Sequence, residues 1–190
     1  MDDGALVGGH VALDFANTTA WRLDVRRAAD RVATPAALLD FAATTGLVEP
    51  LPEDRPAPDD EQAMRAVRRL RAALQHLLDA AVDDTPASPA DLEAVRRAYL
   101  DAWRRAELTA LPLHPEVRVT GTADLVHPLA LAVVDLLSGP LDRLRRCAGP
   151  GCGWFFLDRS RNLSRRWCRS EDCGNRARAR RHYARTTTDR

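Results

Sequence analysis

The sequence contains no lysine: all 28 of its basic residues are arginines. We interpret this first as a coding bias toward GC-rich codons. The choice of arginine over lysine is therefore not by itself a sign of selection for bidentate phosphate contacts. Long hydrophobic runs are absent as well. Runs such as residues 129–134 are far too short to cross a bilayer, so we expect no membrane partner.

A secretory signal is also missing, because residues 1–4 are acidic and no positively charged region precedes an apolar one. We therefore expect a cytoplasmic protein. In a reducing compartment, four cysteines point to metal binding before disulfides. A length of 190 residues with 45% hydrophobic residues fits one ordinary domain, or one domain with a small appendage, around a real core.

The sequence lacks the motifs that indicate an enzyme. It has no glycine-rich phosphate loop, no serine nucleophile elbow and no histidine–glutamate pair at metalloprotease spacing. The histidines are scattered, and His127 at the start of an apolar segment is expected to be a turn or capping residue. We therefore expect a protein that is not an enzyme. Undetected chemistry in the N-terminal part remains the alternative.

The formal net charge of +1 hides a segregation of charge along the chain. Residues 143–190 hold fourteen arginines against four acidic residues, a net charge of +10, whereas residues 1–142 carry a net charge of −9. A basic segment joined to an acidic body suggests a polyanionic partner. The alternative is a solvated tail that contacts its own acidic body.

The spacing of apolar residues predicts amphipathic helices in the N-terminal part, most clearly over residues 59–82. Thr34-Pro35 and Ser88-Pro89 are typical helix starts, with a capping residue followed by proline at the first helical position. An apolar segment, residues 129–137, predicts a central core helix. The alternation over residues 116–120 predicts a short strand or hairpin, and four prolines between residues 49 and 58 predict a loop.

All four cysteines lie between residues 147 and 173, in two pairs with the same spacing: Cys147-x4-Cys152 and Cys168-x4-Cys173. This arrangement is typical of small zinc modules, in which thiolates supply tetrahedral ligands. We predict one Zn²⁺ per chain in a structural site made by these four residues. A redox dithiol, an iron–sulfur site and two disulfides remain alternatives. A catalytic zinc is disfavoured because four thiolates leave no open position.

The residues around the cysteines predict the outline of a treble-clef-like finger. Residues 153–157 read as a strand, residues 158–162 as a turn and residues 165–167 as a returning strand. Cys173 then opens a helix, from Gly174 to about Thr186, whose positive N-terminal end favours a thiolate.

The C-terminal segment is rich in arginines, and its helix is polar on almost every side. Such a helix leaves solvent or a polyanion as its neighbour, so we predict a nucleic-acid interface in which arginines contact phosphates. The residues predicted to contact DNA are Arg159, Arg161, Arg165, Arg166, Arg176, Arg178, Arg180, Arg181, His182 and Arg185. Asn175 and one or two arginines are candidates for reading base edges.

The residues Cys173-Gly174-Asn175-Arg176 resemble the signature of the CGNR zinc-finger family. Residues 146–158 and 178–183 also match the surroundings of that motif, and residues 9–18 are similar to the start of the ABATE domain that precedes the finger in this family. The resemblance implies a bacterial, DNA-binding, stress-induced transcription regulator, with the four cysteines at the family's zinc positions. It leaves Asn175 to cap the helix or to brace a zinc thiolate.

We therefore expect a mainly α protein: a multihelical N-terminal domain with a small β element over residues 1–140, and a treble-clef-like zinc finger over residues 141–190. The expected function is transcription regulation through DNA binding by the finger. An RNA-binding or protein-interaction zinc module is the alternative. The N-terminal domain is expected to be a sensor for a small-molecule effector or a homodimerisation body. Its pocket is expected between the helices from Asp59, Ser88 and Pro128, near Tyr99, Trp103 or Trp21, unless these aromatics are ordinary core.

Overall fold

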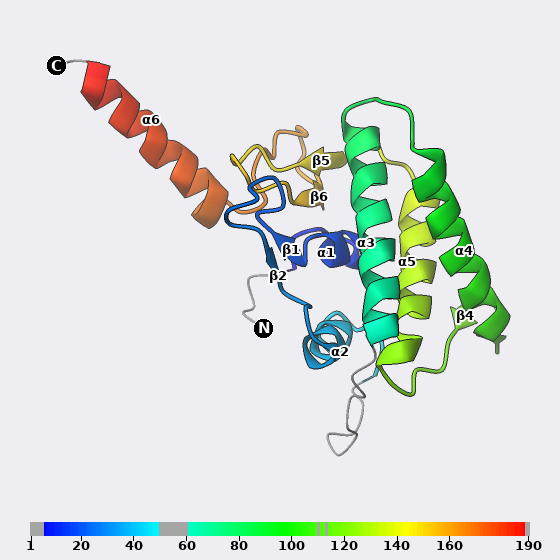
Figure 1. The fold of residues 1–190 in the computed structure, drawn as a ribbon. Helices are drawn as coiled ribbons and strands as arrows, with labels where there is room; N and C mark the ends of the chain where they lie inside the picture. The colour runs from blue at the N-terminus through cyan, green and yellow to red at the C-terminus, as the bar shows by residue number, and fades with distance from the viewer. Residues whose placement is uncertain (1–5, 50–60, 110, 113, 189–190) are drawn as a thin grey trace.

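The computed structural model describes residues 6–49, 61–109, 111–112 and 114–188, so the proline-rich loop predicted at residues 49–58 lies almost entirely outside the described residues. The described chain is mainly helical (Figure 1). Its helices are α1 (Val11–Ala16), α2 (Pro35–Thr44), α3 (Glu61–Val82), α4 (Pro89–Arg105), α5 (Val126–Ser138) and α6 (Asn175–Thr188), with a 3-10 turn at Thr122–Asp124 and a π turn at Ser170–Gly174. Its strands are β1 (Thr19–Ala20), β2 (Ala29–Asp30), β3 (Glu107–Leu108), β4 (Pro115–Glu116), β5 (Leu144–Arg146) and β6 (Phe155–Leu157).

Two helices begin where the sequence predicts. α2 starts at Pro35, and the hydroxyl of Thr34 accepts a hydrogen bond from the amide three residues further on. α4 starts at Pro89, and Ser88 caps it in the same way. A side-chain acceptor satisfies an amide that the first turn leaves without a partner, and proline gives up an amide that has no helical acceptor.

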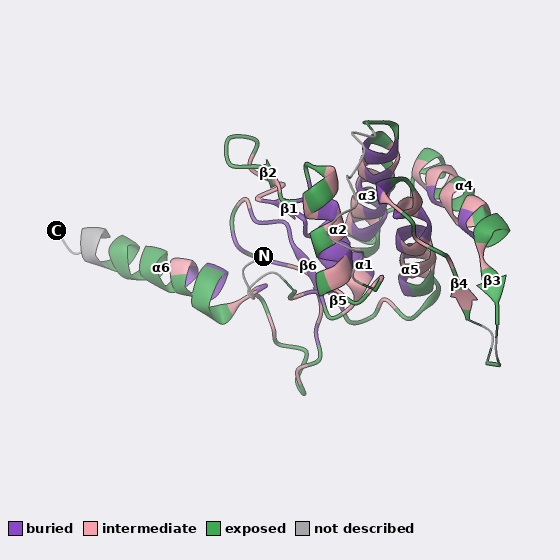
Figure 2. Ribbon diagram, turned by 90° about the horizontal axis from the view of Figure 1, so that it is seen from below, coloured by how far each residue is buried: buried purple, intermediate pink, exposed green. Residues whose placement is uncertain are grey.

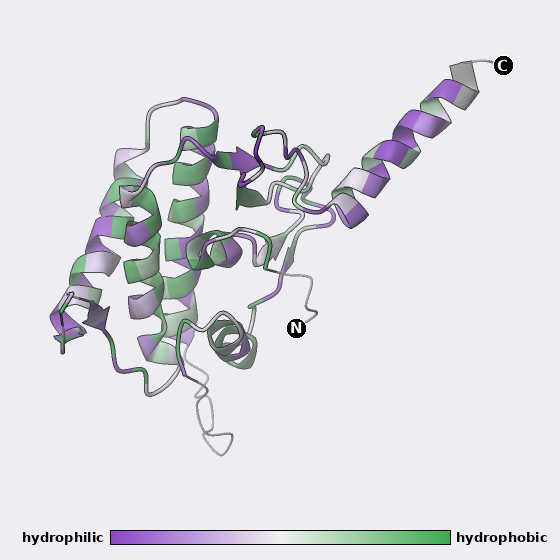
Figure 3. Cartoon of the chain, turned by 180° about the vertical axis from the view of Figure 1, so that it is seen from behind, coloured by the Kyte–Doolittle hydropathy of each residue, from purple (hydrophilic) through white to green (hydrophobic). Residues whose placement is uncertain are grey.

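The core forms where three long helices, α3, α4 and α5, lie side by side and α1 packs against α3 and α5 (Figure 1). Apolar residues on the facing sides of these helices fill the interior (Figure 3). Phe15 of α1, Phe41 of α2, Leu74 of α3 and Leu129 of α5 are almost completely buried there. The predicted central helix corresponds to α5, which starts three residues earlier than the apolar pattern indicates.

The β structure consists of three two-stranded antiparallel sheets, β1–β2, β3–β4 and β5–β6. The strand predicted at residues 116–120 is wrong in extent. Only Pro115–Glu116 forms a strand, paired with β3, and residues 117–120 form none. Thr120 instead leads into the 3-10 turn, because its amide and its hydroxyl both donate to the carboxylate of Asp124.

The hairpin of the finger also differs from the prediction. β6 pairs with β5, which lies just before the first cysteine, and residues 165–167 form no strand. The physical reason is the tight turn between Cys147 and Cys152, which reverses the chain directly from β5 into β6 with Gly151 at a φ of 75°. Residues 165–167 approach this turn through a single backbone bond, from the Ala148 amide to the Arg166 carbonyl, at 2.9 Å.

The finger and the N-terminal helices pack against each other. Leu144 of β5 and Phe155 of β6 belong to the same buried cluster as α1, α3 and α5. The Asn17 amide both donates to the Phe155 carbonyl and accepts from the Phe155 amide, each at 2.8 Å. Gly8 accepts a further bond from Leu157 at 2.8 Å. A boundary near residue 140 therefore separates two stretches of sequence that share one core in space.

α6 is the exception to this packing. It extends away from the rest of the molecule, and α3, α4 and α5 lie on the opposite side of the finger (Figure 1). Almost all of its described residues are exposed (Figure 2). None of the helices in the described part of the chain has the length and apolar character that a bilayer crossing needs.

Candidate zinc centre and nucleic-acid interface

The four cysteines are brought together from three places in the finger. Cys147 and Cys152 flank the turn between β5 and β6, Cys168 precedes the π turn, and Cys173 lies inside it. All four are buried, and their sulfur atoms lie within 4.8 Å of one another. The Cys152–Cys168 and Cys168–Cys173 sulfur distances are 3.8 and 3.6 Å. Tetrahedral zinc with Zn–S bonds of about 2.3 Å requires sulfur separations of about 3.8 Å, so this cluster is a site for one zinc ion.

The thiols of this cluster compete for protons. The hydrogen bond from the Cys152 thiol, followed by that from Cys168, lowers the pKa of Cys147 to about 2. Hydrogen bonding to Cys147 raises the pKa of Cys152 to about 12 and raises that of Cys168 as well. Four sulfur atoms this close are all deprotonated only with a cation among them, which is the chemistry of structural zinc.

Backbone amides and a glycine shape the zinc site. The amides of Gly149 and Cys168 donate to the Cys147 sulfur at 3.4 and 3.3 Å. A Cβ at Gly149 would lie 2.7 Å from the Cys173 sulfur, so only glycine lets the turn approach the second pair of cysteines this closely. The sequence indicates a tight turn here, but the contact across the cluster follows only from the fold.

Arg176 braces a zinc ligand. Its guanidinium donates to the Cys173 sulfur at 3.2 Å, pairs with Asp172 at 3.3 Å and stacks on Trp21 with 4.7 Å to the ring centroid. Asn175, in contrast, donates to the Glu171 carbonyl and accepts from Arg178. The bracing of a thiolate that the resemblance suggested for Asn175 is therefore made by Arg176, and Asn175 stabilises the turn that opens α6.

Besides Arg176, three of the arginines predicted to contact DNA bind the protein itself. Arg165 donates to the backbone carbonyls of Trp167, Cys168 and Val7, and stacks on the Phe156 ring. Arg159 donates to the Gly9 carbonyl at 2.8 Å. Arg178 donates to Ser170 as well as to Asn175. Together with Arg176, these side chains hold the finger, the N-terminal segment and the start of α6 in place.

The other predicted contacts lie on exposed surface. The described structure gives the guanidinium groups of Arg161, Arg180, Arg181 and Arg185 no intramolecular partner, and Arg166 lies over the Trp167 ring while remaining exposed. His182 forms an edge-to-face contact with Tyr183, which is 70% exposed. Hydrophilic residues cover most of α6 (Figure 3). Four of the six residues in this exposed set lie on α6, which extends away from α3, α4 and α5 (Figure 1).

Trp21 is a site residue that the sequence did not reveal as one. The sequence suggests Trp21 only as a wall of an effector pocket, yet Trp21 lies against the finger and joins Arg176 to the loop between β1 and β2. No sequence pattern indicates this contact, because Trp21 is 152 residues away from its cluster partner Cys173.

His127, expected at a turn, is buried in the first turn of α5, and its Nδ1 has no hydrogen-bond partner within the described residues.

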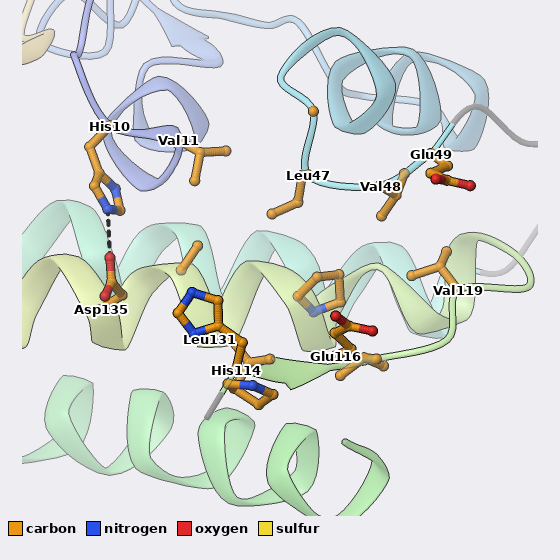
Figure 4. Close-up of a pocket in the computed structure, with 15 residues that line it drawn as sticks. His10, Val11, Leu47, Val48, Glu49, His114, Glu116, Val119, Leu131 and Asp135 are labelled. Carbon is orange, nitrogen blue, oxygen red and sulfur yellow. Dashed lines mark hydrogen bonds and ion pairs between the residues drawn. The ribbon is translucent and has the colours of Figure 1, made fainter. Parts of the chain in front are cut away.

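A pocket of about 1040 Å³ lies between α1, the segment after α2, β4 and α5 (Figure 4). Apolar side chains such as Leu131 line it, and at one end the His10 Nε2 donates to Asp135 of α5 at 3.0 Å. This is not the pocket predicted between α3, α4 and α5. Tyr99 and Trp103 do not line it and instead form an edge-to-face pair on α4, with 6.1 Å between ring centroids.

Comparison with known families gives two matches along the chain. A family model described as "Putative stress-induced transcription regulator", ABATE, matches residues 9–140. The model of the CGNR zinc finger matches residues 143–186. No curated protein matches the sequence. The two matches adjoin near residue 140, and the second contains all four cysteines.

Proposed function

The chain belongs to the ABATE family and carries a CGNR zinc finger, and from this premise we propose that it is a transcription regulator that binds duplex DNA through α6. In this proposal the finger acts in the cytoplasm as a binding module, and the protein is not an enzyme. The zinc is structural, since its four protein thiolates leave no open position for a substrate.

The observation that carries the proposal is the isolation of α6. A helix of fourteen residues is about 21 Å long. Of its described side chains only Ala177 is buried, and Arg180, Arg181 and Arg185 are exposed along it. A helix that projects from the molecule with most of its polar surface exposed is suited to the major groove of B-DNA, which is about 12 Å wide.

The distribution of charge supports the same partner. Residues 1–142 carry a net charge of −9 and would repel DNA at close range. In the fold, the helices of that acidic body lie on the far side of the finger from α6 (Figure 1). A polyanion that approaches from this side therefore meets α6 before it meets the acidic body.

The shape of α6 favours DNA over the alternative of double-stranded RNA. The major groove of A-form RNA is deep and too narrow for side-chain readout, and proteins recognise such RNA mainly across its minor groove. A single straight helix without a flat aromatic platform does not provide the stacking surface that single-stranded RNA uses.

The proposal is tested by titrating the zinc-loaded full chain into labelled duplex DNA, double-stranded RNA and single-stranded RNA. We expect the tightest binding to duplex DNA. Arg181→Ala should weaken it about 8-fold in 0.1 M salt, if one phosphate contact is lost. The matched control is Arg104→Ala, which replaces an exposed arginine in the last turn of α4. Equal losses in the two variants, or preferred binding to RNA, would contradict the proposal.

The N-terminal domain, in this proposal, senses an effector and controls the finger through the segment before α1. His10 and Val11 line the pocket of Figure 4, and the preceding Gly9 accepts from Arg159 of the finger. A ligand that binds two arrangements of this segment with different affinity shifts the finger between them. The matching readout is a change in DNA affinity on His10→Ala, which alters a pocket residue at the start of α1 and none of α6. Sedimentation of the full chain tests the homodimer that we expected from the sequence.

A further inference from the structure

We propose that the loop between β1 and β2, residues 21–28, forms a second DNA-contacting element beside α6. This inference rests on the proposed function and assigns part of the DNA interface to the N-terminal domain instead of the finger alone. In Figure 1 the loop lies next to the base of α6, at the end of the molecule away from α3, α4 and α5.

The loop packs against the turn between Cys147 and Cys152 and the residue after it, here called the zinc turn (residues 147–153). The Leu23 amide donates to the Gly151 carbonyl at 3.2 Å, and Arg22 Nε donates to the Gly153 carbonyl at 2.8 Å. A Cβ at Gly151 would lie 2.8 Å from Asp24, and one at Gly153 would lie 2.7 Å from Leu23. Both glycines also have positive φ. The zinc turn and the loop therefore approach each other closely enough to move as one unit.

A stack of side chains ties the same loop to α6. Two guanidinium groups lie against Trp21: that of Arg27 is 3.3 Å from a ring centroid of the indole, and that of Arg176 is 4.7 Å from one. Arg176 is in the first turn of α6 and also donates to the zinc ligand Cys173. These contacts hold the loop and α6 in a defined relative position. A duplex bound by α6 therefore also meets the loop.

Charge distinguishes this loop from the acidic domain around it. Arg22, Arg26 and Arg27 lie in eight residues that contain one acidic residue, Asp24. Arg22 forms an ion pair with Asp79, and Arg27 stacks on Trp21. Arg26, in contrast, is exposed, and its guanidinium has no partner within the described residues. Arg26 is therefore the side chain available to a phosphate.

The tip of the loop carries exposed apolar side chains. Val25 is 82% exposed and Leu23 is 54% exposed, between the arginines. Proteins that bind the minor groove often insert apolar side chains between base steps and use arginines to read the groove. Arginine–phosphate contacts next to a recognition helix also fix the register of a protein on the duplex. The loop therefore has the arginines and apolar side chains that this role needs. α6, which lies beside the loop, defines the groove that the loop meets.

The test uses the zinc-loaded full chain and duplexes of 20 and 10 base pairs. Arg26→Ala should weaken binding to the longer duplex about 8-fold in 0.1 M salt and flatten the slope of log affinity against log salt by about 0.9. Arg26→Glu should weaken it further. Because the loop contacts the flank of the site, both variants should lose less on the short duplex, where part of that flank is missing.

The controls separate this inference from the proposed function. Arg104→Ala and Arg104→Glu apply the same charge changes on α4, and zinc content and thermal unfolding of all variants should equal those of the wild type. If the wild type binds DNA and Arg181→Ala weakens it, but Arg26→Ala behaves like Arg104→Ala, the loop has no DNA role and the function of α6 stands. If the wild type binds no duplex DNA, both proposals fall.

Discussion

At the scale of single residues, the arginines of the C-terminal segment divide into two groups. Arg165 and Arg176 donate hydrogen bonds to groups of the finger itself. Arg180, Arg181 and Arg185, in contrast, are exposed on α6. A guanidinium that already donates to a thiolate or to backbone carbonyls contributes to the shape of the interface more than to its affinity. Substitutions in the two groups should therefore produce different losses.

The zinc ligands belong to the same scale. Cys168→Ser should reduce the zinc content from one per chain to nearly none, because binding needs all four thiolates and so small a finger depends on the metal for its folding. We expect the finger to melt while the signal of α3, α4 and α5 in circular dichroism remains, since Leu74 and Leu129 hold the helical core. Ser164→Ala, an exposed change in the same segment, is the control. Stoichiometric zinc in Cys168→Ser would contradict the assignment.

Arg176→Ala should lower the zinc affinity about 10- to 100-fold, as is typical when a hydrogen bond to a metal ligand is lost. Competition with a chelator of known affinity measures this. Arg180→Ala removes an exposed guanidinium from the same helix and should leave zinc binding unchanged while weakening DNA binding. Equal zinc affinity in Arg176→Ala and the wild type would show that the 3.2 Å contact with Cys173 does not brace the site.

At the scale of secondary-structure elements, α3 connects the helical core to the elements that support the finger. Its Arg71 forms a bidentate ion pair with Asp30 at the end of β2 and donates to Thr18, and its Gln75 donates to the Ala16 carbonyl. Its Asp79 pairs with Arg22 of the loop and with Arg146 of β5. α3 thus buries its apolar face in the core, and its polar side chains hold the loop and β5 in position.

The Asp30–Arg71 pair gives a prediction about pH. Burial raises the pKa of the Asp30 carboxyl, but the hydrogen bonds and charge of Arg71 outweigh it and leave the pKa below its ordinary value of 3.8. A lowered pKa in the folded state gives stability that is complete above the unfolded pKa and is lost as the pH falls through the folded one. Asp30→Asn should lower the free energy of unfolding by about 2 to 3 kcal/mol at pH 7.

Denaturant unfolding of wild type and variant between pH 7 and pH 3 measures this difference, which should shrink below about pH 4. Acid release of zinc is common to both proteins and cancels in the comparison. Asp101→Asn removes a partly exposed carboxylate that pairs with Arg105 on α4 and lies 3.7 Å from His127, and it should have a small effect. A difference for Asp30→Asn that stays constant over the whole range would contradict the role of the ion pair.

At the scale of the whole molecule, the separation of charge is arranged in space as well as along the chain. The acidic body holds the loop of residues 21–28 and the finger at one end, and α6 projects beyond them (Figures 1 and 2). The overall net charge of +1 therefore understates the positive field that a polyanion meets when it approaches from the side of α6.

If about six arginines engage phosphates, log affinity for duplex DNA should fall against log salt with a slope of roughly −5. Between 50 and 200 mM salt this corresponds to a loss of about a thousandfold, which fluorescence anisotropy resolves. Replacing exposed arginines on α4 should leave the slope unchanged. Binding that is insensitive to salt over this range would mean that phosphates are not the main contact.

Local patterns in the sequence determined much of this protein. The paired spacing of Cys147, Cys152, Cys168 and Cys173 predicted the zinc site, since four thiolates supply all the ligands of a tetrahedral structural zinc ion. The Thr34 and Ser88 caps predicted two helix starts, because capping depends only on neighbours a few residues away. The polar composition of α6 predicted its exposure.

Only the tertiary structure decided which partners meet across long separations. It paired β6 with β5 instead of residues 165–167, because the glycine-containing turn between Cys147 and Cys152 reverses the chain directly. It placed Trp21 on Arg176 and gave Arg176 a bond to the Cys173 sulfur. Contacts of this kind depend on how separate elements pack, and no period or spacing along the chain encodes them. The fold therefore selected, from a chain rich in arginine, which guanidinium groups hold the finger and which remain available to a partner.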